Sequence, residues 1–297
     1  KLNDTLKAEG YARAYSGATI DGASVSYRVV RVANFPIWWW YRWGSYPTST
    51  EMEITSGVTQ TDALGKFNIS FQAVPDLSVD RSSDPVFDYT IYADVTDING
   101  ETHSSTTTVS VGYKSLRIGV PVSNINRDQI TPSGKEFTIN STNLAGEFEA
   151  ARGIIKIYEL KSPAKAFRNR MWEQADRALY TREQYYQLFP YDPYEDEGNK
   201  YKWARGTEVF VLNFDTEQKK NFTLENLNTW NPGEYVLEAT AIDKSGQEVK
   251  ELSYFTLYAP SSKTIPFVQV HYFQGVQLTA EPGEKATFVS GTADKKI

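Results

Sequence analysis

The most concentrated chemistry in this 297-residue sequence is a run of aromatic side chains at residues 34–43, NFPIWWWYRW. It holds four of the seven tryptophans, namely Trp38, Trp39, Trp40 and Trp43. An exposed indole offers a large apolar face and an N–H donor, which suits stacking on a sugar or a peptide. The structural alternative rests on the alternation of side chains along an extended chain. Trp38 and Trp40 would then share one side and Trp39 the other, with one side covering the sandwich and the other facing the next domain, and we favour this packing role.

A second aromatic set lies between residues 162 and 206, where the sequence departs from the β pattern that surrounds it. Its candidate contact residues are Trp172, Phe189 and Tyr191. These side chains either pack on their own domain or face a neighbouring domain. We favour contact between domains, since interfaces within one chain commonly bury about 600–1,500 Å².

Two acidic stretches have the residue types of a cation site. Asp97-Ile-Asn-Gly100 meets only part of the calcium-loop pattern, which also needs a Glu six residues after the glycine. Its counterpart at residues 243–246 places a lysine in the same loop, as expected of a plain hairpin turn. The run 192–197 (DPYEDE) is interpreted as a solvated acidic loop. We therefore predict no metal site and no cofactor.

Catalytic signals are weak throughout the chain. There is no cysteine, which excludes a thiol nucleophile, and the two histidines, His103 and His271, stand in unrelated positions. The sequence has no G-x-S-x-G, phosphate-loop or dinucleotide pattern. Carboxylates are plentiful, but a sequence cannot place two of them the ~5–9 Å apart that glycoside hydrolysis needs. We expect a protein that is not an enzyme.

The composition limits the classes of partner that we expect this chain to bind. The formal net charge is −6 and there is no basic tract, so nucleic acid is not expected to bind. The mean hydropathy is −0.49 and no apolar run approaches the ~18 residues of a membrane helix, so we expect no direct membrane insertion by this segment. The chain begins at Lys1 with no visible signal peptide, and we expect it to be a piece of a longer protein.

The elements that would position these residues are mainly strands. Val25, Tyr27 and Val29 alternate with smaller or polar residues, and 66–71 (KFNISF) repeats the pattern. Turn residues separate such runs, most clearly Asn99-Gly100. About seven short strands with regular turns predict an antiparallel β-sandwich.

The chain also repeats itself. Residues 89–100 (YTIYADVTDING) align without a gap with residues 235–246 (YVLEATAIDKSG). This separation is longer than a solenoid repeat of ~20–50 residues, so whole domains recur. We predict three domains, at residues 1–113, 114–260 and 261–297, the last being only the start of a third sandwich.

The insertion at 162–206 has helical signals. Ser162-Pro163 predicts a helix start, followed by an apolar stripe at Phe167, Met171, Ala175 and Ala178. Residues 181–184 (TREQ) resemble a capping box that opens a second short helix, stopped by Pro190.

Several stretches together resemble the bacterial α2-macroglobulin family. They are 16–29 (SGATIDGASVSYRV), 58–71 (VTQTDALGKFNISF), 89–102 (YTIYADVTDINGET), 143–160 (NLAGEFEAARGIIKIYEL) and 189–197 (FPYDPYEDE). The last is similar to an insertion in family members from gut bacteria of the Bacteroides type. The resemblance implies a string of fibronectin-like macroglobulin domains. It also implies a bait segment and often a thioester in a C-x-E-Q motif, neither of which is recognisable in this chain.

The resemblance thus implies a non-catalytic scaffold segment of a protease-trapping protein at the cell envelope, periplasmic or on the surface, with a lipid anchor on the full-length protein. Its partners would be the neighbouring domains of the same polypeptide and, for the whole protein, a target protease. The alternative is a tandem Ig-like adhesin or glycan-binding module that uses Trp38–Trp43 as its platform.

Overall fold

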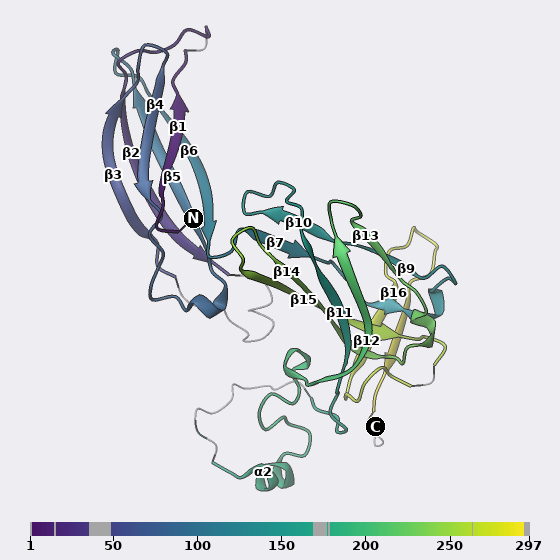
Figure 1. Ribbon diagram of the computed structural model, residues 1–297. Coiled ribbons are helices and arrows are strands. Elements are labelled where there is room, and N and C mark those ends of the chain that lie inside the picture. Colours follow the sequence, from purple (N-terminus) through teal and green to yellow (C-terminus); the bar gives the residue numbers. More distant parts are fainter. Residues whose placement is uncertain are drawn as a thin grey trace. The chain divides into compact units, whose positions relative to one another are not determined.

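The computed structural model describes residues 2–14, 16–35, 49–168, 177, 179–262 and 264–293. Strands joined by tight turns dominate it, and the helical pieces are short, so the predicted all-β class is confirmed (Figure 1). The chain divides into two compact units. The first comprises Lys1–Arg117, Thr142–Glu149 and Asp243–Gln247, and the second comprises Ile118–Ser141, Ala150–Ile242 and Glu248–Ile297. The sequence-based boundaries near residues 113 and 260 stay predictions.

The first unit contains a sandwich of two sheets. Its larger sheet has the order β3-β2-β5-β6, all antiparallel, and its smaller sheet pairs β1 with β4. The strands are β1 (Thr5–Tyr11), β2 (Ser24–Asn34), β3 (Met52–Gln60), β4 (Lys66–Gln72), β5 (Val86–Thr96) and β6 (Thr102–Gly112). A single 3-10 turn, η1 (Arg81–Ser83), precedes β5.

The predicted alternation decides which side chains form this core. Val25 and Val29 from β2, and Ile69 and Phe71 from β4, are almost wholly buried. Tyr89 completes the core, with its ring 5.5 Å from that of Phe71. Its hydroxyl donates to the Val74 carbonyl at 2.8 Å, which satisfies the one polar atom that burial would otherwise leave unpaired.

The second unit has the same plan with additions. Its main sheet has the order β12-β11-β14-β15-β8, in which only β8 runs parallel to its neighbour. Two strand pairs, β7 with β10 and β9 with β13, form the opposing layer. The strands are β7 (Leu116–Gly119), β8 (Ile125–Asn126), β9 (Lys135–Thr138), β10 (Asn140–Asn143), β11 (Arg152–Leu160), β12 (Arg205–Asp215), β13 (Asn221–Leu224), β14 (Gly233–Ile242) and β15 (Glu248–Tyr258).

The sequence repeat corresponds to a structural one. β14 lies between β11 and β15 as β5 lies between β2 and β6. Tyr235, the counterpart of Tyr89, is likewise buried, stacks on Phe255 at 5.4 Å, and donates to the Asn231 carbonyl at 2.6 Å. A tyrosine near the start of such a strand that bonds to the backbone just upstream is typical of Ig-like sandwiches.

Four hairpin turns share one hydrogen-bond pattern, and one of them contains Asp97 of the stretch that resembles part of a calcium loop. They start at Asp62, Asp97, Asn143 and Asp243, and each has a glycine of positive φ three residues later. In each, one side-chain oxygen accepts the main-chain N–H groups two and four residues ahead; for Asp97 these are Asn99 and Glu101, at 2.8 and 2.9 Å. The Asp97 carboxylate therefore stabilises the conformation of its own turn.

Residues after 260 form a small hairpin within the second unit. It pairs β16 (Tyr272–Gln277) with β17 (Thr287–Gly291). Three further 3-10 turns complete the unit: η2 (Arg127–Gln129), η3 (Lys200–Lys202) and η4 (Leu227–Thr229). Within the described residues, no helix has the length and apolar character to cross a bilayer.

The predicted helix at Ser162-Pro163 is wrong over the part that the structure describes. Residues 161–168 are irregular. Arg168 explains why, because its N–H donates to the Tyr191 carbonyl at 2.9 Å and its guanidinium pairs with Asp192. These long-range bonds replace helical ones. Of the predicted stripe, Met171, Ala175 and Ala178 lie outside the described residues.

Candidate functional site

The insertion between β11 and β12 is the part of the chain that plain sandwich architecture does not require. Its one described α-helix is α2 (Arg182–Leu188). The Thr181 hydroxyl accepts the Gln184 N–H at 3.3 Å, and the Gln184 side chain accepts the Thr181 N–H at 3.0 Å. The predicted capping box is thus confirmed. A seven-residue helix is still too short to persist alone, so its surroundings must hold it.

An aromatic cluster provides that support. Tyr185 lies at its centre, with ring centroids 5.1 Å from Phe189, 5.4 Å from Tyr194 and 6.0 Å from Tyr186. Tilted and edge-on ring pairs at such spacings each add about 0.5–1.5 kcal/mol beyond burial. The Lys165 ammonium lies 4.0 Å from the centre of the Tyr186 ring, within cation–π range.

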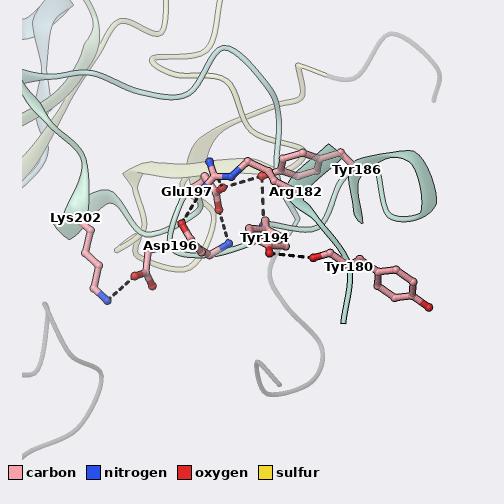
Figure 2. Close-up of polar contacts among 8 residues, drawn as sticks. Tyr180, Arg182, Tyr186, Tyr194, Asp196, Glu197 and Lys202 are labelled. Atoms are coloured by element: carbon pink, nitrogen blue, oxygen red, sulfur yellow. Dashed lines mark hydrogen bonds and ion pairs between the residues drawn. The ribbon is translucent and has the colours of Figure 1, made fainter. Parts of the chain in front are cut away.

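Glu197 ties the acidic loop to this helix (Figure 2). Its carboxylate accepts the Tyr186 hydroxyl at 2.9 Å and the Glu195 N–H at 2.7 Å, and lies 3.1 Å from Arg182 Nη1. Burial opposes the charge of Glu197, but the main-chain donors, Tyr186 and Arg182 outweigh burial and lower its pKa. The carboxylate is therefore held ionised as a structural anchor, and not poised for proton transfer near neutral pH.

The other three acids of the loop are paired as well. Asp192 bonds to Arg168 at 3.0 Å, Glu195 to Arg182 at 2.5 Å, and Asp196 to Lys202 at 2.8 Å. Asp192 is 2% exposed, so the interpretation of this run as solvated is wrong for that residue. Among the described residues, no three His, Cys, Asp or Glu side chains gather as a metal site.

The return limb of the insertion attaches to the main sheet. Lys200 Nζ lies 2.9 Å from Oε2 of Glu234, a carboxylate only 1% exposed on β14. The Tyr201 ring meets Tyr254 of β15 edge-on at 4.8 Å. These contacts fix the limb over the outer face of β14 and β15.

Trp203 joins three segments at the end of this limb. Its indole N–H donates to the Glu197 carbonyl at 2.8 Å, and its ring lies edge-on to Phe267 at 5.5 Å. Sequence reasoning missed Trp203, Lys200 and Tyr201. The available signal was 200–203 (KYKW), in which cations and aromatic rings alternate directly before a strand.

The structure describes only two of the predicted contact residues, Phe189 and Tyr191. Trp38, Trp39, Trp40, Trp43 and Trp172 lie outside the described residues. Phe189 packs on Tyr185 and remains 36% exposed, while Tyr191 is 42% exposed. Their predicted role in contact between domains stays a prediction, whereas the observed anchoring of the insertion is made by the 200–203 turn.

A cavity of about 710 Å³ lies beside this anchor in the second unit. Its walls include Tyr258, Pro266, Phe267 and Tyr272, and each side chain that lines it is uncharged. Such a space can enclose an apolar group. The described part of the lining offers no carboxylate, histidine or cation to act as an acid, a base or an ion ligand.

No protein-family model matches the sequence, and no curated protein matches it. Solved structures that resemble the fold include the native α2-macroglobulin of Escherichia coli, at 11% identity and a TM-score of 0.34, over 98% of this chain and 18% of that one. A Salmonella α2-macroglobulin mutant gives 11% identity and a TM-score of 0.36 over the same shares. Fibronectin(III)-like modules of Clostridium thermocellum CbhA give 10% identity and 0.24, over 87% of each chain.

These likenesses concern fold alone. The chain spans about a fifth of the length of the two α2-macroglobulins it matches. The all-β architecture rests on the strands and sheets described above.

Proposed function

We propose that this chain is a non-catalytic scaffold segment of a bacterial α2-macroglobulin-like protein, which contributes to protease entrapment at the cell envelope. The observation that carries the proposal is the repeated sandwich, with equivalent core tyrosines, Tyr89 and Tyr235, and the same hairpin turn used four times. The five quoted stretches that resemble the family supply the functional class. The paired acids of the insertion support a structural role over a chemical one.

In this role the segment acts mechanically. Each sandwich has its own core, and short turns with internal hydrogen bonds keep its strands in register. Rigid units of this kind would hold the bait and capture regions of the full-length protein, so that cleavage elsewhere changes how the domains pack. The partners would be neighbouring domains and the target protease, with no cofactor and no bond chemistry in this segment.

The test uses the full-length protein. Small-angle scattering is recorded before and after treatment with an active serine protease, with the same protease lacking its nucleophile as the matched control. A trap should become more compact only with the active enzyme, and the captured enzyme should lose activity on large substrates while keeping it on small peptides. An unchanged scattering profile after complete cleavage would contradict entrapment.

A glycan-binding module remains the second candidate, because four tryptophans fall within ten residues. The purified chain would be applied to a glycan array beside Trp39→Ala and Trp40→Ala, with Trp203→Phe as a control outside the cluster. Binding lost only in the first two variants supports this function. Absence of binding in the unmodified chain, or equal binding by all three variants, counts against it.

A further inference from the structure

The start of the second sandwich runs beside β15 and is hydrogen-bonded to it at several residues. The Ser253 hydroxyl donates to the Val120 carbonyl at 2.7 Å, and the Thr256 N–H donates to the Asn124 side chain at 2.9 Å. Further along, β8 pairs with β15 at Leu257. Residues 120–126, here called the seam segment, therefore close one edge of the main sheet.

Glu251 lies on the core face of β15 in the same stretch. It stands opposite Ala239 in the β14–β15 ladder, and Ala239 stands opposite Ile155 in the β11–β14 ladder. Ala239 and Ile155 are wholly buried. The cross-strand row Ile155–Ala239–Glu251 therefore faces the core, and Glu251 is its last member. Side chains two residues apart share a face, which places Glu251 between Val249 and Ser253.

The first sandwich shows what this position is like without a seam segment. There, Ala93 stands opposite Ser105 on β6, and the repeat makes Ser105 the counterpart of Glu251. Ser105 is exposed, whereas Glu251 is partly buried. A carboxyl group therefore occupies this row where the seam segment runs beside β15 and its access to water is reduced.

Among the residues that the structure describes, the surroundings of Glu251 offer no compensating charge. From β14, Leu237, Ala239 and Ala241 share its face, and β11 adds Ile155. Ile118 near the end of β7 and Val120 at the start of the seam segment are both buried. The buried side chains of the opposing layer are also without charge, namely Phe137, Ile139, Ser141, Phe222 and Leu224.

The nearest charged groups on these strands are already engaged. Glu238 pairs with Lys250 and Arg205 from alternate positions, on the other face of the sheet. At the turn before β15, the Asp243 carboxylate accepts five hydrogen bonds, three from its own turn and two from Ser115, and Lys244 pairs with Glu149. No ion pair of Glu251 occurs among the described residues, and burial raises its pKa to about 7.

We infer that Glu251 makes the seam segment a pH-sensitive latch, closed on β15 when this carboxyl is protonated and loosened when it ionises. The direction follows from linkage. A carboxyl whose pKa is higher in the closed form stabilises that form fully below its ordinary value of 4.5, and this stabilisation is lost as pH rises through about 7. Opening lets water solvate the charge.

Hydrogen exchange of the whole chain at pH 5 and pH 8 tests the latch, with rates corrected for intrinsic exchange. Protection of the Thr256 amide, which donates across the seam to the Asn124 side chain, should fall roughly fiftyfold at the higher pH, given a pKa that moves from 4.5 to about 7. Amides of β11, such as Ile155, serve as an internal reference for global opening. Glu251→Gln should abolish the pH difference, while Glu248→Gln, at an exposed position of the same strand, should keep it.

Two results would overturn the inference. One is equal protection of the Thr256 amide at both pH values in the unmodified chain, and the other is a pH difference that persists in Glu251→Gln. If that variant folds poorly, a carbon-13 titration of the Glu251 carboxyl in the unmodified chain decides the matter. A midpoint near 7 supports the latch, and one near 4.5 refutes it.

Discussion

Asp243 and Asp97 occupy equivalent turns in successive repeats. Asp243 also accepts hydrogen bonds from a residue outside its turn. Both accept two N–H groups of their own turn, but Asp243 also accepts the N–H of Ser115 at 2.9 Å and its hydroxyl at 3.3 Å. Asp243 is 5% exposed, while Asp97 is only partly buried. Burial disfavours the Asp243 charge, but the donors of Ser115, Gln247 and Ser245 outweigh it and lower the pKa to about 2.

This difference predicts an acid-sensitive contribution to stability. A carboxyl with a lowered pKa stabilises the fold above its ordinary value of 3.8, and the contribution is lost as pH falls toward 2. We expect Asp243→Asn to cost about 2 kcal/mol at pH 7 and little at pH 2. Urea unfolding at both pH values measures this. Asp97→Asn is the matched control, and an equal loss at pH 7 in both variants would refute the special role of Asp243.

Arg31 is a second charged residue whose burial would be unfavourable without a paired charge. It is 4% exposed on the core face of β2, where its guanidinium reaches the Val74 carbonyl at 3.0 Å and Asp76 at 3.1 Å. Removing one member of a buried pair leaves the other uncompensated, so Arg31→Met should destabilise the first sandwich by about 3 kcal/mol. Arg28→Met removes only a contact over the Tyr92 ring and should cost less than about 1 kcal/mol. Similar midpoints of thermal unfolding for the two variants would contradict this.

At the scale of elements, the insertion depends on its return limb more than on its helix. Trp203 contacts both the acidic loop and Phe267, whereas Tyr191 is 42% exposed. We therefore expect Trp203→Ala to release the insertion and to speed proteolytic cleavage between residues 162 and 204 at least several-fold. Tyr191→Ala should leave the rate near that of the unmodified chain. Limited proteolysis with mapped cleavage sites measures this, and equal rates would show that the helix holds itself.

Local patterns predicted the elements well where neighbours in sequence decide the structure. Alternation placed Val25 and Phe71 in the core, and the capping box placed the start of α2 at Thr181. The helix expected from Ser162 failed because Arg168 bonds to residues more than twenty positions away, which no local pattern records. The same holds for Trp203 and for Glu251, whose surroundings exist only once distant strands pair.

For the whole molecule, the decisive property is that each compact unit has its own core. Phe87 of β5 and Phe255 of β15 are both wholly buried, one in each unit. Truncating a buried phenylalanine to alanine costs about 3–5 kcal/mol, which lowers the melting temperature of its unit by about 10 °C or more. Calorimetry of the chain should resolve two transitions, of which Phe87→Ala shifts only one and Phe255→Ala only the other. Units that unfold separately can serve as independent struts, because strain in one does not unfold the next. A single transition that both variants shift equally would mean that the chain unfolds as one body, and the view of repeated, separate struts would have to be abandoned.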